Sequence, residues 1–146
     1  MSTKYFQRRQ NILKDKIAKE NLDGMIVTNL THIRYLCGFT GSSATLLITA
    51  DQIHFITDGR YVVQSEKEVK GAKVVIDSIP HYEVIKKQNL LTNSQSIGFD
   101  GNNVSHQGYQ QISKALSNIN LKNITGVIEK MAMSKDEKEL EAIRTT

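Results

Sequence analysis

Three aspartates have the residue type and placement for metal chemistry. Asp58, Asp77 and Asp100 each follow a segment that we expect to be a β-strand, and open α/β sheets collect their ligands at the carboxyl ends of strands. Three carboxylates gathered there could hold magnesium in a metal or nuclease site. Each of them directly precedes Gly or Ser, however, and Asp in such a dipeptide commonly forms a turn. We therefore interpret all three as turn formers and expect no metal site at them.

The four histidines and the single cysteine are isolated in the sequence. His32, His54, His81 and His106 show no His-Glu-x-x-His or similar spacing, whereas a two-metal hydrolase needs several carboxylates, usually with a histidine, around two ions about 4 Å apart. Cys37 excludes an intrachain disulfide and is expected to be a small buried hydrophobe. The residues thus predict no catalytic group and no metal ligand on this chain.

Residues 38–43 read GFTGSS, a loop whose glycines would let backbone N–H groups approach an anion. A Walker loop would need Lys after the second Gly and then a helix. Here Ser42 and Ser43 run instead into a strand-like segment. We interpret residues 38–43 as a tight, exposed loop that presents Phe39 to a partner or a substrate.

The composition is that of one globular domain. Of 146 residues, 39% are hydrophobic and 23% charged, with a net charge of +4. The basic residues alternate with acids, as over residues 66–70, which is typical of solvated helix faces rather than of a nucleic-acid-binding stripe. The apolar runs are shorter than the roughly twenty residues of a membrane helix, and the start lacks a signal-peptide core. We expect a cytoplasmic protein with no nucleic-acid or membrane partner.

The hydrophobic pattern alternates between helical and strand periods. Ser105 is expected to cap a helix on which Tyr109, Ile112 and Leu116 share a face. Helices are predicted over 4–21, 60–70, 82–91 and after Ser105, with a turn or short helix over 29–38. Strands are predicted over 25–28, 44–49, 52–57, 73–76, 96–99 and 124–128. This order predicts an α/β fold with a mixed sheet of about six strands, one antiparallel hairpin and flanking helices.

The carboxyl end carries the one expected boundary. Ser134 and Glu137 have the spacing of a helix capping box, and Leu140 and Ile143 begin an apolar stripe behind it. We assign residues 1–130 to one domain and residues 131–146 to a linker with the start of a further helix.

Two segments are similar to a known family. Residues 31–43, THIRYLCGFTGSS, resemble the pattern NIRYLTGFTGS, and residues 57–64, TDGRYVVQ, resemble TDGRY..QA. Both patterns belong to the amino-terminal domain shared by Xaa-Pro aminopeptidases, prolidases and creatinase. The resemblance covers nearly the whole chain. It implies a ribonuclease-H-like motif, no metal chemistry in this domain, and a piece of a longer protein whose catalytic domain begins with the helix after residue 131.

By the same resemblance, the complete protein would be a cytosolic Xaa-Pro dipeptidase or Xaa-Pro aminopeptidase that cleaves proline-containing peptides. It would use two divalent ions, commonly manganese, held by two Asp, one His and two Glu beyond Thr146. This chain alone would not be an enzyme. Its partners would be its own catalytic domain and the second subunit of a homodimer.

The resemblance also implies candidate contact residues, because the two matching segments lie near the dimer contact in the family. Phe39 and Tyr61 would offer apolar surface there. His32, Arg34 and Arg60 would offer donors to a peptide carbonyl or carboxylate. For Arg34 and Arg60 the alternative is a structural role, in which they bind loop carbonyls or a local carboxylate such as that of Asp58.

Two other functions remain open on the sequence. Relatives with this two-domain arrangement include proteins without peptidase activity, such as the large subunit of a histone chaperone, so the chain could be a peptide- or protein-binding module. TDGRY and the GFTGSS loop are closer to the peptidases, while His32 and Cys37 replace the usual Asn and Thr. A nucleic-acid-binding domain is suggested only by charge and fold analogy, and it would require steeply salt-dependent binding.

Overall fold

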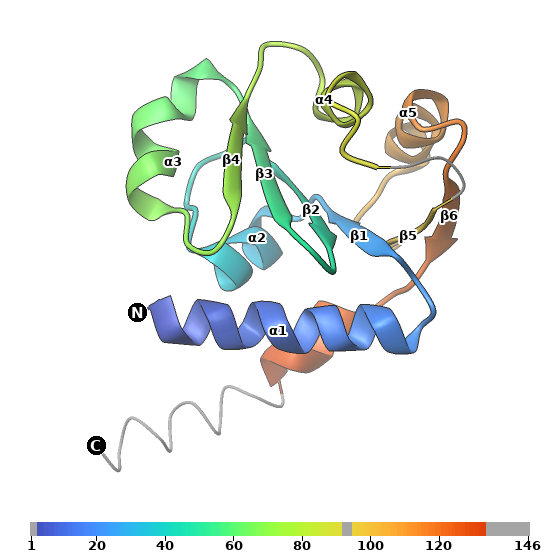
Figure 1. Cartoon of the computed structure of the whole chain (residues 1–146), viewed down its shortest axis with the longest axis horizontal. Coiled ribbons are helices and arrows are strands. Elements are labelled where there is room, and N and C mark those ends of the chain that lie inside the picture. Colours follow the sequence, from blue (N-terminus) through green and yellow to red (C-terminus); the bar gives the residue numbers. More distant parts are fainter. Residues whose placement is uncertain (1–2, 92–94, 134–146) are drawn as a thin grey trace.

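A six-stranded mixed β-sheet forms the centre of the molecule in the computed structural model, which describes residues 3–91 and 95–133 (Figure 1). The strand order is β4-β3-β2-β1-β5-β6. Strand β2 runs antiparallel to both of its neighbours, and the other adjacent pairs are parallel. The predicted mixed sheet with an antiparallel hairpin is therefore confirmed. The strands are β1 Gly24–Val27, β2 Thr45–Thr49, β3 Ile53–Thr57, β4 Lys73–Ile76, β5 Ser96–Phe99 and β6 Asn120–Asn123.

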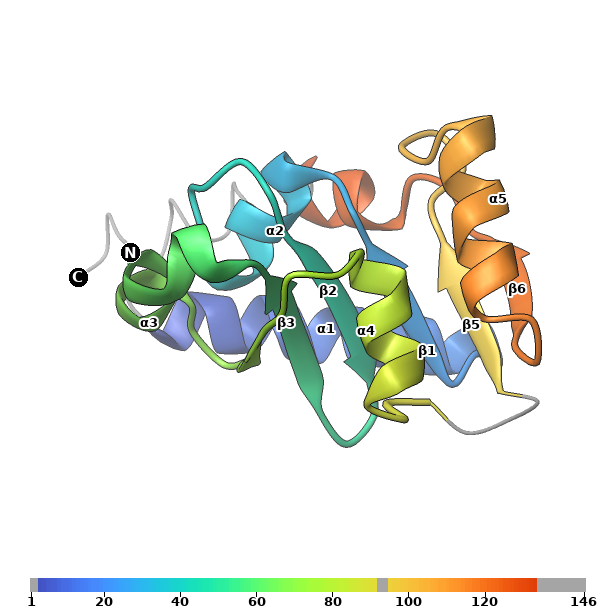
Figure 2. The ribbon, with the colours of Figure 1, turned by 90° about the horizontal axis from the view of Figure 1, so that it is seen from above.

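Helices cover both faces of this sheet (Figures 1 and 2). One face carries α1, α2 and a helix over residues 127–133; the other carries α4 and α5. The 3-10 turn η1 and helix α3 lie at the β4 edge. The bounds are α1 Thr3–Lys19, α2 Leu30–Cys37, η1 Gly59–Tyr61, α3 Val62–Glu68, α4 His81–Lys87 and α5 His106–Ala115.

Alternation along the central strands divides the core into two layers. In β2, Leu46 and Ile48 pack toward α1 and α2, whereas Leu47 between them packs toward α4 and α5. Strand β1 is buried at all four positions, as expected for a strand that is covered on both faces. Because the central strands are packed on both faces, the loops that leave their ends start from well-defined positions.

Helix α2 has a well-defined start and end. The Asn29 side chain accepts a hydrogen bond from the backbone N–H of His32 at 3.1 Å, which satisfies one of the free donors of the first turn. Gly38 ends the helix in the left-handed conformation, with φ of 88° and its N–H bonded to the Arg34 carbonyl, a conformation that glycine adopts without steric cost. The "turn or short helix" expected over 29–38 is thus a capped helix that leads into the 38–43 loop.

The strand predicted over residues 124–128 is wrong. The last strand among the described residues is β6, which begins four positions upstream, and residues 127–133 are helical. Ile128 and Met131 are both buried, and their spacing of three suits the inner face of this helix. Ile124 is also buried, but it lies between β6 and the turn that precedes the helix. Strand β6 was missed because it is an exposed edge strand rich in Asn and Lys. Gly126, with φ of 77°, lies in the turn before the helix rather than in a strand.

Smaller differences concern helix ends and faces. Helix α4 ends at Lys87, and Asn89 has a positive φ of 50°, so the helix predicted to residue 91 is shorter. On α5, Ser105 caps the helix by accepting from the Gly108 N–H, which confirms that prediction. Ile112 and Leu116 are buried on its inner face, whereas Tyr109 is 38% exposed.

Among residues 3–91 and 95–133, the helices are too short or too polar to cross a membrane. The predicted capping box of Ser134 and Glu137, with Leu140 and Ile143, lies outside the described residues, so the boundary near residue 130 stays a prediction.

Candidate functional site

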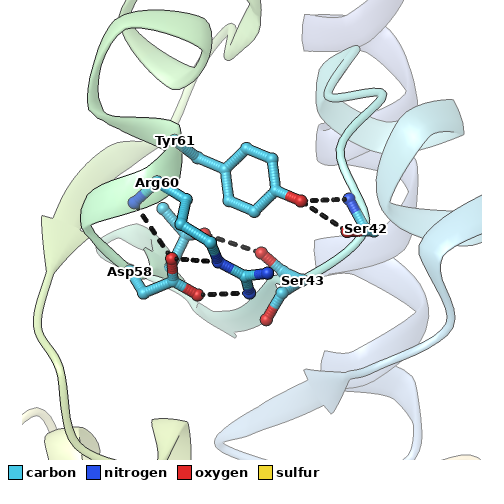
Figure 3. Close-up of polar contacts among 6 residues, drawn as sticks. Ser42, Ser43, Asp58, Arg60 and Tyr61 are labelled. Carbon is cyan, nitrogen blue, oxygen red and sulfur yellow. Dashed lines mark hydrogen bonds and ion pairs between the residues drawn. The ribbon is translucent and has the colours of Figure 1, made fainter.

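The 38–43 loop and the 57–61 turn, which carry the two sequence motifs, lie side by side (Figure 3). The Tyr61 hydroxyl is hydrogen-bonded to the Ser42 hydroxyl and accepts from the Ser42 N–H at 3.2 Å. At the end of β3, the Thr57 hydroxyl donates to the Ser43 carbonyl at 2.6 Å. Two segments far apart in the sequence therefore form one surface, which we call the motif surface: residues 38–43 and 57–61.

Phe39 is buried, so the expectation that it is exposed for a partner or substrate is wrong. Only 1% of its surface is accessible. Its ring packs edge-on against Phe55, with centroids 4.7 Å apart, and against Tyr61 at 5.3 Å. Gly41 makes this packing possible, because a Cβ there would collide with the Phe39 ring and lie 2.8 Å from Tyr61 Cε1. Phe39 fixes the loop to the core instead of contacting a ligand.

Arg60 and Asp58 form a two-point ion pair on the motif surface (Figure 3). Arg60 Nε lies 2.8 Å from Asp58 Oδ1, and Nη2 lies 2.9 Å from Oδ2. Asp58 Oδ1 also accepts from the Arg60 backbone N–H at 3.0 Å, which caps η1. Arg60 therefore makes the structural contact with a local carboxylate that was the alternative to substrate binding. Its side chain is still 65% exposed. A contact with substrate stays a prediction.

The same contacts shift the acid–base properties of the motif surface. Hydrogen bonds from the Arg60 side chain and backbone lower the pKa of Asp58 to about 2. The pairing in turn raises the pKa of Arg60, so this ion pair stays charged at neutral pH. Hydrogen bonds with the Ser42 side chain and backbone lower the pKa of Tyr61.

Helix α3 holds the loop from its other side. Glu68 accepts hydrogen bonds from the Thr40 N–H at 2.8 Å and from the Thr40 hydroxyl at 3.0 Å. Gln64 donates to the Thr40 hydroxyl at 3.1 Å and to Glu68 at 3.2 Å. The sequence did not predict that Ser42 would contact Tyr61 of the second motif, nor that Glu68 would contact Thr40 of the first. Because Glu68 lies outside both motifs, only its position on the helix that follows TDGRY could have indicated it.

Arg34 and His32 occupy different surroundings although both are on α2. Arg34 is exposed in the last turn and lines an open groove of about 500 Å³ with Phe6 and Thr40 beside the loop. The His32 side chain is only 10% exposed, and its Nε2 lies 3.4 Å from Glu129 Oε1. The structure therefore brings Arg34, Arg60 and Tyr61 to the loop region but directs His32 elsewhere, so a direct contact of His32 with a peptide is not supported.

The three aspartates behave as the turn formers that were predicted. Asp58, Asp77 and Asp100 each accept a hydrogen bond from a backbone N–H one or two residues ahead, at 2.7–3.0 Å. Cys37 is likewise buried, as expected, and its burial raises the pKa of the thiol to about 11. Within the described part of the chain, one group of three or more potential metal ligands converges: His32, Asp100 and Glu129. Sequence reasoning missed it because its members are far apart in the chain.

The chemistry available at the motif surface is recognition. Its exposed polar groups are hydroxyls, backbone donors and an arginine that is already charge-paired. Near it, Thr45 Oγ1 and His81 Nδ1 form a hydroxyl–imidazole pair at 2.7 Å, an arrangement that can activate a nucleophile. Thr45 is only 3% exposed, so this hydroxyl is enclosed by the fold and is not presented at the surface. The exposed groups of this surface are hydrogen-bond donors of the kind that a carbonyl or a carboxylate accepts from.

Comparison with known proteins agrees with the two motifs. Residues 8–133 match the model of the creatinase/prolidase N-terminal domain. An uncharacterized peptidase of Bacillus subtilis, YqhT, is 28% identical over 131 residues, which are 90% of this chain and 37% of that protein. The chain therefore spans little more than a third of this curated relative.

Solved structures share the fold. A Xaa-Pro aminopeptidase from Streptococcus pyogenes superposes with a TM-score of 0.78 and 30% identity, over 88% of this chain and 98% of that one. The N-terminal domain of the cytoplasmic peptidase PepQ from Mycobacterium tuberculosis superposes with a TM-score of 0.75 and 29% identity, over 84% of this chain and 97% of that one. Because the family model covers most of the chain and both motifs lie inside it, this chain belongs to the creatinase/prolidase N-terminal domain family.

Proposed function

We propose that this chain is the non-catalytic amino-terminal domain of a cytosolic, proline-specific metallopeptidase, either a Xaa-Pro dipeptidase or a Xaa-Pro aminopeptidase. Family membership supports this proposal, and so do the names of the relatives, which include Xaa-Pro peptidases of known structure. The chain spans 37% of the Bacillus subtilis peptidase, which leaves room for a separate catalytic domain in the complete protein.

The catalytic metals would be bound outside this chain. A two-metal hydrolase needs a larger set of converging carboxylates, and a bridging water between two ions about 4 Å apart. The described residues offer one group of three potential ligands, drawn from His32, Asp100 and Glu129. These residues do not fit a two-ion centre, so no step of peptide hydrolysis is assigned to this chain.

The role left to the domain is to shape substrate access. The observation that carries this proposal is the junction of the two motifs through Tyr61 and Ser42, with Phe39 buried beneath them. That junction makes the motif surface rigid, and the Asp58 carboxylate orients the exposed Arg60 guanidinium on it. A rigid wall with an oriented cation suits the carbonyl or carboxylate of a bound peptide.

Dimer formation is the second part of the proposed role. Val62 and Val63 follow the TDGRY motif directly and are 47% and 63% exposed. Two adjacent exposed valines beside a rigid loop offer apolar area to a second subunit. We propose that the motif surface with these valines faces the partner subunit, close to that subunit's active site.

Steady-state kinetics of the full-length protein test the substrate role. Arg60→Ala is expected to raise KM for a Xaa-Pro peptide about tenfold and to leave kcat within about twofold, because it removes binding energy that substrate and transition state share. Lys87→Ala is the matched control, since Lys87 also pairs with a turn aspartate, Asp77, at 3.1 Å but lies on α4. Equal kinetics for both variants would reject a substrate contact by Arg60.

A further inference from the structure

We propose that His32, Asp100 and Glu129 form a mononuclear site for a divalent transition-metal ion of the zinc class. One potential ligand atom from each residue lies within 4.8 Å of the other two. The set offers an imidazole nitrogen and two carboxylate oxygens, which are common zinc ligands. This site is separate from the proposed two-metal peptidase centre and from the motif surface.

The distance between two of the ligands already suits a metal. His32 Nε2 and Glu129 Oε1 are 3.4 Å apart. Two ligands that each lie about 2.1 Å from a tetrahedral zinc ion are separated by about 3.4 Å. A cation can therefore be placed between these two atoms, and the Asp100 oxygen, which lies within 4.8 Å of both, would move toward it to complete the set.

Asp100 supplies an independent indication of a ligand. The residue is 5% exposed, and its Oδ2 is buried without a hydrogen-bond partner. Its Oδ1 accepts from the Asn102 N–H at 2.9 Å and so maintains the turn after β5. A buried carboxylate oxygen without a partner is unfavourable. A bound cation would satisfy it, and the turn-forming role would persist.

The position in the fold is also that of a ligand site. Strands β1 and β5 are adjacent and parallel, but the chain leaves β1 toward α2 on one face and β5 toward α5 on the other (Figure 2). Ligands of open α/β sheets bind at such a switch point, outside the carboxyl ends of the strands. A small cavity there is lined by Val27, Asn29, His32 and Asp100.

Neighbouring amides orient the exposed member of the set. Asn103 Nδ2 donates to Glu129 Oε1 at 3.3 Å, and Asn103 Oδ1 accepts from Asn29 Nδ2 at 2.7 Å. Such hydrogen bonds fix the direction of metal-binding carboxylates. Because Glu129 belongs to the helix over residues 127–133, a bound ion would tie that helix to the sheet through Asp100 and to α2 through His32.

Calorimetric titration of the metal-stripped chain with ZnCl₂ tests the site. We expect saturable binding of one ion and, at a hundredfold excess over Kd, a rise of the melting temperature by about 5 °C or more. Asp100→Asn and Glu129→Gln should each weaken binding at least about tenfold. Asp100→Asn keeps Oδ1 for the Asn102 N–H, and Glu129 is an exposed residue of its helix, so both variants should fold.

His106→Gln is the control, because His106 is an exposed histidine on α5 that is expected to leave zinc affinity unchanged. Circular dichroism of each variant without metal confirms that it is folded. Absence of saturable zinc binding would overturn the proposal. Equal affinity of wild type, Asp100→Asn and Glu129→Gln would overturn it as well, since the ion would then occupy some other site. Neither readout depends on peptidase activity.

Discussion

Arg60 donates two hydrogen bonds to the carboxylate of Asp58, from Nε to Oδ1 at 2.8 Å and from Nη2 to Oδ2 at 2.9 Å, and its side chain is still 65% exposed. The pair lies within the TDGRY motif, only two residues apart. It gives the charged residues of that motif a local structural role, and it sets the direction in which the guanidinium can contact a ligand.

The ion pair predicts a specific pH dependence. The Asp58 pKa is lowered to about 2 from 3.8, so the folded state holds the ionised form more strongly than the unfolded chain does. The stabilisation is present above pH 4 and is lost as the pH falls from about 4 toward 2. In the Arg60→Ala variant, NMR titration should show the Asp58 pKa moving upward. An Asp58 pKa that is the same in both proteins would contradict the pairing.

Phe39 is expected to stabilise the domain rather than to bind ligand. Phe39→Ala should lower the free energy of unfolding by about 3–5 kcal/mol, because it leaves a cavity between Phe55 and Tyr61. Urea denaturation of this chain measures the change. Tyr109→Ala serves as the comparison. Because Tyr109 is 38% exposed, this substitution should lower the free energy of unfolding by only about 1 kcal/mol. A loss below that value for Phe39→Ala would mean that the ring is not in the core.

Two glycines of the motif surface should differ in how well they tolerate alanine. A Cβ on Gly41 would collide with the Phe39 ring, whereas a Cβ on Gly59 would meet nothing within 4 Å. Gly41→Ala is therefore expected to destabilise the domain by about 1–3 kcal/mol, and Gly59→Ala should be nearly neutral. Thermal unfolding of both variants checks the contrast. Equal melting temperatures would show that the loop does not pack as described.

Cys37 should be unreactive while the domain is folded. Its side chain is buried, and burial raises the pKa of the thiol to about 11, so almost no thiolate exists at pH 8. Labelling with a disulfide reagent at pH 8 should be slow without denaturant and complete in unfolding concentrations of urea. Rapid labelling of the folded chain would place the thiol at the surface.

Most of the fold could be predicted because the pattern of the central elements is strong. The strands over 73–76 and 96–99 have the predicted bounds, and the hairpin of β2 and β3 follows from two β-rich runs around a tight turn. Strand β6 could not be recognised, because an exposed edge strand of Asn, Leu and Lys lacks an apolar signal. Ile124 and Ile128 were assigned to one strand, although Ile128 and Met131 have the spacing of the helix over residues 127–133 in which they lie.

The site was less predictable, because its key relationships join residues distant in the sequence. An aromatic residue between two glycines was expected to be exposed, yet Phe39 is enclosed by Phe55 and Tyr61. Nothing in the spacing of His32 and Asp100 indicates that they meet at the ends of β1 and β5. Local hydrogen bonds, such as those of Asp58, could be predicted because turn chemistry depends on neighbouring residues alone.

Hydrolysis of a Xaa-Pro peptide by two purified proteins tests the central claim most directly. This 146-residue chain and the full-length protein are each supplied with manganese, and release of the product is followed over time. The account predicts turnover by the full-length protein and none by the chain alone. Turnover by this chain, or none by the full-length protein with a range of divalent ions, would contradict it.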